Sequence, residues 1–288
     1  MPVSLILDPH EKDLGGGFKV RRLLPAAARQ GVGPFLFFDH FGPVTATPAD
    51  NHDVRPHPHI GLATVTYLFE GAILHRDNLG SVQRIEPGAI NWMTAGSGIV
   101  HSERTPPDLR NRTRASHGLQ LWTALPKPFE ETAAAFHHTP ADALPAWSGA
   151  GIKARVLIGS AFGLTSPVET FAQTLYLDIA AEPGAVLTLE PAVEECALYS
   201  VDRPLLVDGT PVPPATLAVL APGQAARIEA PEGARYVVIG GAAIDGHRHM
   251  WWNFVSSSKE RIEAAKADWV AQRMGQIPGE TEFIPLPG

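Results

Sequence analysis

Glycine and proline recur along the whole chain, and these frequent turn-forming residues limit the folds that the chain can adopt. The sequence has 27 residues of each type among its 288. Between them lie short runs rich in β-branched and aromatic residues, including ATVTYLF, GAINWMT, LQLWTAL, TLYLDIA and YVVIGG. Short apolar runs bounded by turn residues are typical of strands rather than of long helices. The sequence therefore predicts an all-β protein made of sandwiches or barrels.

The order of elements suggests that the chain contains one β fold twice. Residues 66–96 and 197–223 each show a strand, a turn, further strands and then a Pro-Gly turn. A repeated order of this kind favours two related domains. The stretch 123–147 is proline-rich, interrupts the strand rhythm and is the best candidate for a linker. We expect an N-terminal domain over residues 1–140 and a C-terminal domain over 141–288.

The last fifty residues differ from the rest because they predict a helix. Ser257 and Glu260 have the spacing of a capping box, an Ala-rich segment follows, and Gly275 can end the helix. We expect a helix over about residues 257–274. Its apolar positions Ile262, Ala265 and Trp269 share one face, which predicts packing against the outside of a barrel.

Composition and charge exclude several classes of protein. The hydrophobic content of 44% is typical of a globular protein, and no apolar run reaches the roughly 18 residues of a membrane span. The net charge of -7 disfavours direct binding to nucleic acid. The N-terminus shows no basic leader or cleavage site, and the single Cys196 allows no internal disulfide. We expect a cytoplasmic protein.

A candidate metal site begins with the sequence RPHPHIG. His57 and His59 stand two residues apart, so on a strand both imidazoles point to the same side. His101 and Glu103 repeat this spacing in GSGIVHSER, about forty residues later. Three imidazoles and a carboxylate suit a divalent first-row metal, although either pair alone can arise by chance.

The longer motifs around these residues resemble the pirin family of the cupin superfamily. The resemblance rests on RPHPHIGLATVTYLFEG, GSVQRIEPGAINWMTAGSGIVHSER and HGLQLWTALP, and it covers nearly all of the N-terminal half. It implies a bicupin, in which two cupin barrels follow one another and only the first holds a metal. The ligands that it implies are His57, His59, His101 and Glu103, around an ion that is usually iron.

The resemblance also implies a function. Some pirins resemble quercetin 2,3-dioxygenases, so the leading hypothesis is a dioxygenase that opens the central ring of a flavonol with O2 and releases CO. Glu103 would be the general base. Fe(II) is the expected metal, while zinc, manganese, nickel and copper suit the same donors. As guesses, Phe37, Trp92 and Met93 would contact the flat substrate.

Other functions and other histidines need separate treatment. The main alternative is a metal-dependent regulatory or redox-sensing binder with a protein partner, as in pirins that resemble transcriptional cofactors. A cupin isomerase or a sugar-binding module is a third hypothesis. A second His-x-His pair, His247 and His249, has no matching carboxylate pair and is interpreted as packing or surface. We interpret the remaining candidates as surface or loop histidines: His75, His117, His137 and His138.

Overall fold

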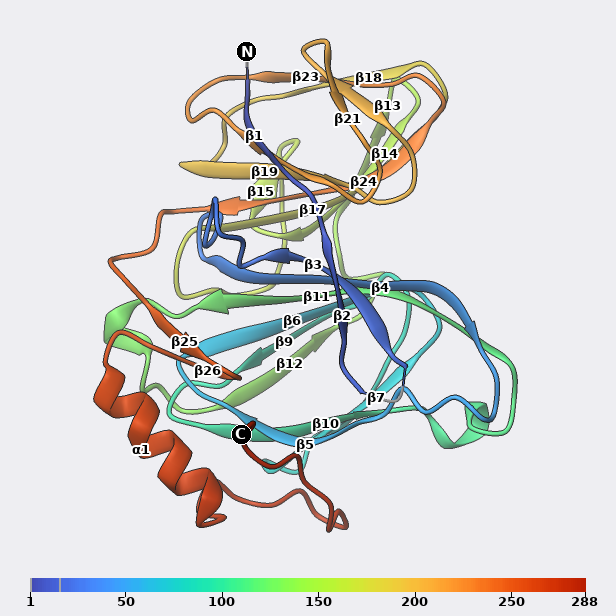
Figure 1. Cartoon of the computed structure of the whole chain (residues 1–288). Coiled ribbons are helices and arrows are strands. Elements are labelled where there is room, and N and C mark those ends of the chain that lie inside the picture. The colour runs from blue at the N-terminus through green and yellow to red at the C-terminus, as the bar shows by residue number, and fades with distance from the viewer. Residues whose placement is uncertain (1, 16) are drawn as a thin grey trace. The chain divides into compact units, whose positions relative to one another are not determined.

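The computed structural model describes residues 2–15 and 17–288, and strands dominate it (Figure 1). A seven-stranded sheet has the order β12-β9-β6-β11-β4-β3-β2, and a four-stranded sheet has the order β5-β10-β7-β8. The strands of the first sheet are β12 (Ala135–Thr139), β9 (Ile90–Thr94), β6 (Leu62–Glu70), β11 (Arg114–Ala124), β4 (Phe35–Ala46), β3 (Lys19–Leu24) and β2 (His10–Asp13). Those of the second are β5 (Val54–His59), β10 (Ile99–Arg104), β7 (Ile73–Asp77) and β8 (Val82–Ile85). The predicted all-β class is confirmed.

The same arrangement occurs a second time. A seven-stranded sheet has the order β1-β22-β19-β24-β17-β14-β13, and a four-stranded sheet has the order β18-β23-β20-β21. The strands of the first are β1 (Val3–Leu7), β22 (Leu217–Leu220), β19 (Glu195–Ser200), β24 (Ala234–Gly241), β17 (Thr174–Ala181), β14 (Ile152–Ile158) and β13 (Ala146–Gly149). Those of the second are β18 (Ala185–Leu189), β23 (Ala226–Ala230), β20 (Leu205–Val207) and β21 (Thr210–Val212). Adding thirteen to each strand number of β5-β10-β7-β8 gives β18-β23-β20-β21, so the repeat predicted from the sequence is present in the topology.

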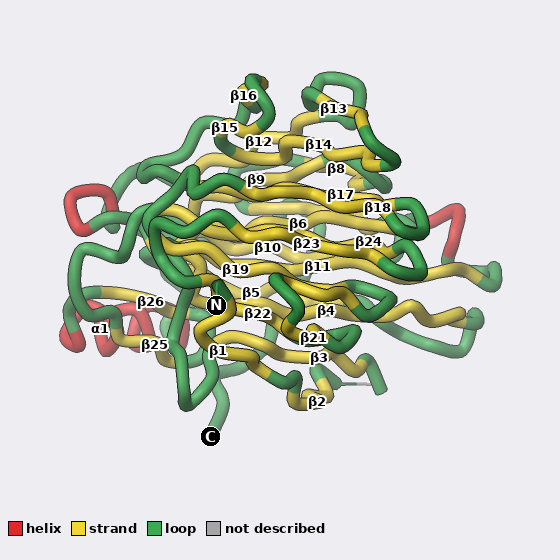
Figure 2. Tube along the Cα trace, turned by 90° about the horizontal axis from the view of Figure 1, so that it is seen from above, coloured by secondary structure: helices red, strands yellow, loops and turns green. Residues whose placement is uncertain are grey.

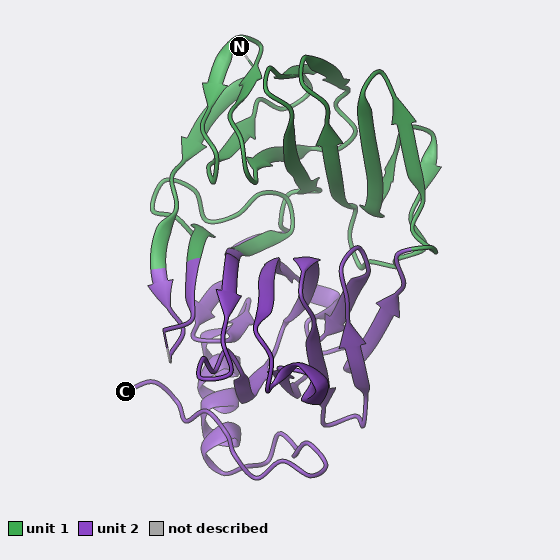
Figure 3. Ribbon diagram, turned by 90° about the vertical axis from the view of Figure 1, so that its right-hand side faces the viewer, with its two compact units in different colours: residues 1–11, 21–38, 142–244 green, residues 12–20, 39–141, 245–288 purple. Residues whose placement is uncertain are grey.

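The contacts within the chain define two compact units (Figure 3). Unit 1 contains residues 1–11, 21–38 and 142–244, and unit 2 contains residues 12–20, 39–141 and 245–288. The strand β1 therefore completes a sheet whose other strands come from residues 142–244. Each unit is assembled from separated stretches of sequence. The division expected near residue 140 stays a prediction.

The stretch 123–147 is not the irregular linker that its prolines suggest. It includes the end of β11, a 3-10 helix η2 (Lys127–Phe129), β12 and the start of β13. The strand β12 pairs with β9 over its whole length, from Ala135 opposite Thr94 to Thr139 opposite Ile90. Pro126 and Pro128 lie just before and within η2, and Pro140 and Pro145 lie between strands. At these positions the missing N–H group removes no bond from a sheet.

The C-terminal helix α1 (Lys259–Val270) packs on unit 2 beside the hairpin of β25 (His249–Trp251) and β26 (Phe254–Ser256), as Figure 2 shows. Its buried residues are Ile262, Ala265 and Trp269, as predicted. They form one apolar cluster with Ile60 and Val100, which lie on or beside the strands β5 and β10. The helix thus supports the outer face of those two strands.

The ends of the helix differ from the prediction. Ser258 is the N-cap, since its side chain accepts a hydrogen bond from the backbone N–H of Arg261. The hydroxyl of Ser257 instead donates to Glu130 at 2.8 Å. The N-cap is thus one residue later than predicted, and the predicted capping box does not form, because Arg261 stands three residues after Ser258. The helix ends at Val270 because Gln272 adopts a φ of 55°, which a right-handed helix does not allow.

The remaining elements are short. They are the 3-10 helix η1 (Pro107–Leu109) and the strands β15 (Ser160–Ala161) and β16 (Leu164–Thr165), which pair with each other. Within the described residues, no helix is both long and apolar enough to span a membrane.

The interior of unit 1 is apolar, and this predicts a large cost for removing volume from it. Leu198 on β19 is fully buried in its hydrophobic cluster. We expect Leu198→Ala to lower the free energy of unfolding by about 2–5 kcal/mol, through lost burial and the cavity left behind. Val186→Ala, at an exposed position of β18, should change it by less than about 0.5 kcal/mol. Urea denaturation of both variants measures the difference, and similar losses would contradict this account of the core.

Candidate metal centre

Three histidines of unit 2 meet because β5 and β10 are paired antiparallel strands. His101 lies directly opposite His57, and Ile99 lies opposite His59. The ring centroid of His101 lies 4.4 Å from that of His57 and 5.1 Å from that of His59. One donor nitrogen from each residue lies within 4.8 Å of the other two. The sequence prediction that these residues converge is therefore correct, and the convergence follows from direct strand pairing.

The local sequence suits the position of β5 in its sheet. The strand stands at the end of the order β5-β10-β7-β8, and an edge strand tolerates the prolines Pro56 and Pro58. On the outer side of β5 the carbonyl group of Pro56 accepts a hydrogen bond from the backbone N–H of Ile284. Directly after it, Gly61 has a φ of 67°, and a Cβ atom there would lie 2.0 Å from the carbonyl oxygen of Val255. A glycine is therefore needed where the ligand strand turns beneath β26.

Backbone carbonyl groups orient two of the three imidazoles. His57 Nδ1 lies 2.9 Å from the carbonyl oxygen of Arg55, and His59 Nδ1 lies 3.2 Å from that of Asn253. A carbonyl oxygen only accepts hydrogen bonds, so both Nδ1 atoms must carry the proton. Each Nε2 atom then keeps a free lone pair, which is the tautomer that a metal requires.

Burial keeps the three histidines neutral. It lowers the pKa of His57 to about 4, and it lowers the pKa of His59 and His101 well below the ordinary value of 6.5, with further lowering by the neighbouring imidazoles. Neutral imidazole is the form that ligates metals, so no proton has to leave these rings at neutral pH.

The Nε2 atom of His101 shows that a metal fits the site. This atom is buried and has no hydrogen-bond partner within the described part of the chain. A buried polar atom without a partner costs about 1–3 kcal/mol, so such atoms are uncommon unless they serve a function. An ion bound by the three imidazoles would satisfy it.

Glu103 lies close to the histidines but outside the group that they form. It follows His101 by two residues on β10, and a register shift relative to β5 occurs between the two. On its other side it faces His75 of β7. Burial raises the pKa of Glu103 to about 7. Its predicted role as fourth ligand stays a prediction, since the close group contains the three histidines.

The predicted substrate contacts fall in different places. The ring of Trp122 lies 5.1 Å from that of His59, Thr64 pairs with Trp122, and Met93 pairs with Thr64. Because side chains alternate along a strand, Met93 shares the face of Trp122, and the adjacent Trp92 points to the opposite face. Phe37 belongs to unit 1, where the guanidinium of Arg22 lies 4.3 Å from its ring centre. Of the three guesses, Met93 is the one on the face of the sheet that meets the histidines.

Two residues beside the histidines escaped the sequence analysis. His75 and Asp77 on β7 are buried, and Asp77 lies directly opposite His101. The interpretation of His75 as a surface or loop histidine is wrong, because its strand is an inner member of the four-stranded sheet. Its spacing from Asp77 is the same i, i+2 spacing that marks the other two pairs, and this signal could have identified it.

The remaining histidine pair, His247 and His249, lies outside the group. Their ring centroids are 4.6 Å apart, and no third donor joins them within the described residues. The thiol of Cys196 in unit 1 has its pKa raised to about 12 by burial, so it is not a reactive thiolate.

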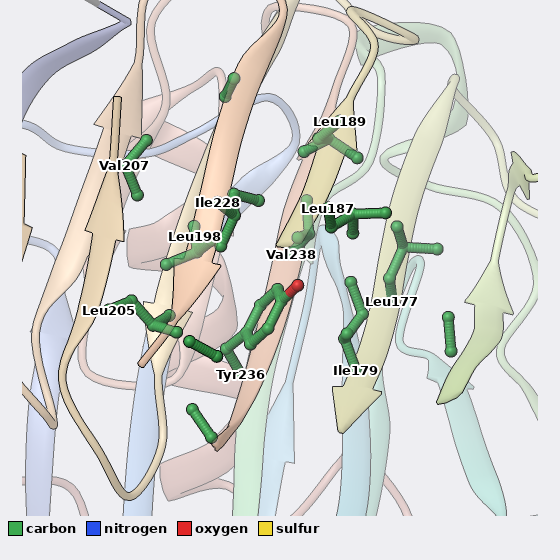
Figure 4. Packing of buried hydrophobic residues seen from close by; sticks show 14 of the residues in the cluster. Leu177, Ile179, Leu187, Leu189, Leu198, Leu205, Val207, Ile228, Tyr236 and Val238 are labelled. Carbon is green, nitrogen blue, oxygen red and sulfur yellow. The ribbon is translucent and has the colours of Figure 1, made fainter. Parts of the chain in front are cut away.

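Unit 1 has apolar residues at every position that corresponds to the site. In the matching strands, Leu187 and Leu189 stand where unit 2 has His57 and His59, and Ile228 stands where it has His101. Ala230 corresponds in the same way to Glu103. Figure 4 shows Leu187, Leu189 and Ile228 within the packed interior. The second barrel is therefore filled by a hydrophobic core, and its described residues contain no group of three metal-binding side chains.

Two related β-barrels, one with a buried three-histidine group and the other with an apolar interior, define a bicupin whose described residues place a metal-binding group in one barrel. The family described as Pirin matches residues 17–123, and the Pirin C-terminal cupin domain matches residues 176–275. The chain belongs to the pirin family.

Individual relatives cover almost the whole chain. A pirin-like protein from Caulobacter vibrioides is 47% identical, over 99% of this chain and 99% of its own. Human pirin is 30% identical, over 93% of this chain and 91% of its own. The crystal structure of quercetin 2,3-dioxygenase from Acinetobacter baumannii is 32% identical and superposes with a TM-score of 0.92, over 99% of this chain and 95% of that one.

The buried histidines predict a specific dependence of stability on pH. Unfolded His57 takes up a proton below its ordinary pKa of 6.5, whereas the folded side chain stays neutral down to about 4. Stability is therefore lost as the pH falls through this window. As the pH falls from about 7 to about 5, His57 should lower the free energy of unfolding of the metal-free protein by about 2 kcal/mol. Urea denaturation at both values should show a smaller loss in His57→Gln than in the wild type.

The comparison with the variant also isolates His57 from Glu103. The pKa of Glu103 is raised in the folded state, so its protonation on acidification increases the free energy of unfolding. This increase is the same in the wild type and in His57→Gln, so it cancels in the comparison. Equal pH dependence in the wild type and in His57→Gln would contradict the neutral, buried state of this histidine.

Proposed function

We propose that the protein is a metal-dependent dioxygenase that uses O2 to open the central ring of flavonols such as quercetin, with release of CO. The observation that carries this proposal is the buried group of three neutral imidazoles beside a carboxyl group that titrates near neutral pH. The similarity to the Acinetobacter baumannii quercetin 2,3-dioxygenase over nearly the whole chain supports it.

In this proposal the ion is held by Nε2 of His57, His59 and His101, with Glu103 as the fourth ligand. We propose Fe(II), although imidazole and carboxylate donors also suit zinc, manganese, nickel and copper. When bound, such an ion supplies Lewis acidity that lowers the pKa of a flavonol hydroxyl group. Elemental analysis of protein purified without added metal identifies the ion.

Glu103 is the proposed general base. In the metal-free protein a pKa of about 7 leaves the carboxyl group half ionised at neutral pH. With an ion bound, the carboxylate would take the flavonol proton once its own bond to the ion loosens. An ordinary exposed glutamate is a weaker base, so burial of Glu103 is what adapts it to this task. Glu103 is within two residues of His101 on one strand, which keeps the base beside the metal ligands.

The side chains around the histidines suit a flat, apolar substrate. Trp122 contacts His59, and Met93 lies on the same sheet face. The ring of Phe136 stacks on that of His75 at a centroid distance of 4.1 Å. We propose that Trp122 and Met93 contact the flavonol rings and that burial keeps water away from the reacting oxygen atoms. The proposed partners are thus a flavonol and O2. A cytoplasmic location stays a prediction.

Turnover is the first test. Protein loaded anaerobically with Fe(II) should shift the absorption of quercetin on binding and should consume O2 and release CO once air is admitted. Glu103→Gln should reduce turnover by about 10²–10⁴-fold, the usual contribution of a general base. His101→Ala should also lose the spectral shift. The exposed His137 offers a control, since His137→Ala should behave like the wild type.

The outcome separates enzyme from regulator. If the metal-loaded wild type consumes no O2 with quercetin or related flavonols, the dioxygenase proposal is wrong. Retention of a bound metal in that case favours a metal-dependent regulatory or redox-sensing binding protein with a protein partner.

Proton release on metal binding is a second test, of Glu103 alone. Below its pKa of about 7, Glu103 must lose a proton to bind a metal, whereas the histidines are already neutral. Binding of Ni(II) should release about one more proton from the wild type than from Glu103→Gln at about pH 6, and the difference should vanish above about pH 8. Calorimetry in buffers of different ionisation enthalpy counts the protons. If the wild type and Glu103→Gln release the same number of protons at about pH 6 as well as above about pH 8, Glu103 is not a ligand.

A further inference from the structure

His75 and Asp77 form a buried polar pair next to the metal centre, yet neither is part of the three-histidine group. They lie on the inner strand β7, where their exposed fractions are 3% and 0%. Burying a charged carboxylate is unfavourable unless strong hydrogen bonds compensate. A pair of this kind therefore calls for an explanation beyond packing.

A chain of hydrogen bonds connects Asp77 to His101. The carboxylate oxygen Oδ2 of Asp77 lies 3.0 Å from Nε2 of His75, and Nδ1 of His75 lies 3.4 Å from Nδ1 of His101. The other oxygen, Oδ1, accepts hydrogen bonds from the backbone N–H groups of Leu79 and Ser81, both at 2.9 Å.

The positions of the protons follow from the acceptor at the end of this chain. The Asp77 carboxylate only accepts, so Nε2 of His75 must carry a proton, and in the neutral imidazole its Nδ1 is then the acceptor. His101 then donates from Nδ1, and its Nε2 keeps a free lone pair. This Nε2 is the buried atom that has no hydrogen-bond partner among the described residues. The pair thus prepares His101 as a ligand.

Packing holds the ring of His75 in place. Phe136 from β12 stacks on it, with an interplanar angle of 11°. Asp77 lies opposite His101, and His75 lies opposite Glu103, through the pairing of β7 with β10. The sheet therefore fixes both ends of the hydrogen-bond chain.

Unit 1 provides an independent comparison. Through the corresponding pairing of β20 with β23, Val207 stands where unit 2 has Asp77, and Leu205 stands where it has His75. Both belong to the hydrophobic cluster drawn in Figure 4. The barrel without the histidine ligands thus also lacks the polar pair, as expected if the pair serves the ligands.

We propose that His75 and Asp77 are positioning residues that select the metal-binding tautomer of His101 and hold its ring in place. The proposal rests on the metal binding assigned above to the three histidines, but it does not depend on flavonol turnover. Carboxylate or carbonyl partners of this kind commonly change metal affinity by about 10–100-fold.

Asp77→Asn is the most direct test, because it reverses the donor and acceptor roles along the hydrogen bonds that connect residue 77 to His101. The amide oxygen must remain with the N–H groups of Leu79 and Ser81, so the amide N–H points at Nε2 of His75. His75 then carries its proton on Nδ1 and donates it to Nδ1 of His101. The proton of His101 moves to Nε2, which blocks the ligand atom. We expect Ni(II) affinity to fall by about tenfold or more.

Substitutions at His75 separate polarity from packing. In His75→Gln, the amide oxygen can accept from His101 while the amide nitrogen donates to Asp77, so affinity should stay within about threefold of the wild type. His75→Leu copies Leu205 of unit 1 and should lose about tenfold or more. Asp178→Asn is the control for loss of a buried carboxylate elsewhere, since Asp178 pairs with Arg235 in unit 1, and it should leave Ni(II) affinity unchanged.

The measurements are competition of each variant against a chelator for Ni(II) and, on metal-free protein, ¹⁵N NMR of the imidazole nitrogens. Loss of affinity in Asp77→Asn together with a tautomer change at His101 supports the proposal. Unchanged affinity in both Asp77→Asn and His75→Leu overturns it, as does a wild-type His101 that carries its proton on Nε2. If the wild type binds no metal, the metal-dependent function proposed above is wrong. In that case the position of the proton on His101, on Nδ1 or on Nε2, alone shows whether His75 and Asp77 select its tautomer.

Discussion

The antiparallel pairing of β5 with β10 is the constraint on which the site depends. It places His57 opposite His101 and brings His59 to the same face of the sheet. The outer face of the same strands carries Ile60 and Val100, which pack against the C-terminal helix. Because side chains alternate between the two faces of a strand, the histidines lie on one face of β5 and β10 and the hydrophobic cluster lies on the other. A shift of one residue in this pairing would exchange the two faces and abolish both.

The two barrels show how one topology supports opposite interiors. In unit 2 the four-stranded sheet presents imidazoles and carboxyl groups inward, and burial penalises every polar atom there that lacks a partner. In unit 1 the same positions hold leucine, isoleucine, valine and alanine, which need no partners. The interiors therefore differ in cost, since the metal-free site of unit 2 leaves His101 Nε2 without a partner among the described residues, and an apolar interior avoids such a cost.

Local pattern predicted the fold class, the helix face and the convergence of three histidines, because each depends on periodicity that the sequence displays. It failed where the answer depends on pairing between distant strands. The sequence around His75 resembles a loop, whereas its strand β7 lies between β10 and β8. Trp92 and Met93 differ only in which face of β9 they occupy, and that depends on the pairing of β9 with β6. The helix start was misplaced by one residue because three consecutive serines, Ser256 to Ser258, offer equivalent caps.

The carbonyl group that holds His59 comes from Asn253, almost two hundred residues later in the chain. During synthesis the ligand strands leave the ribosome well before this residue does. Until then the His59 ring lacks the hydrogen bond that sets its tautomer, and Gly61 lacks the strand that crosses over it. The newly made N-terminal half is therefore an incomplete metal site.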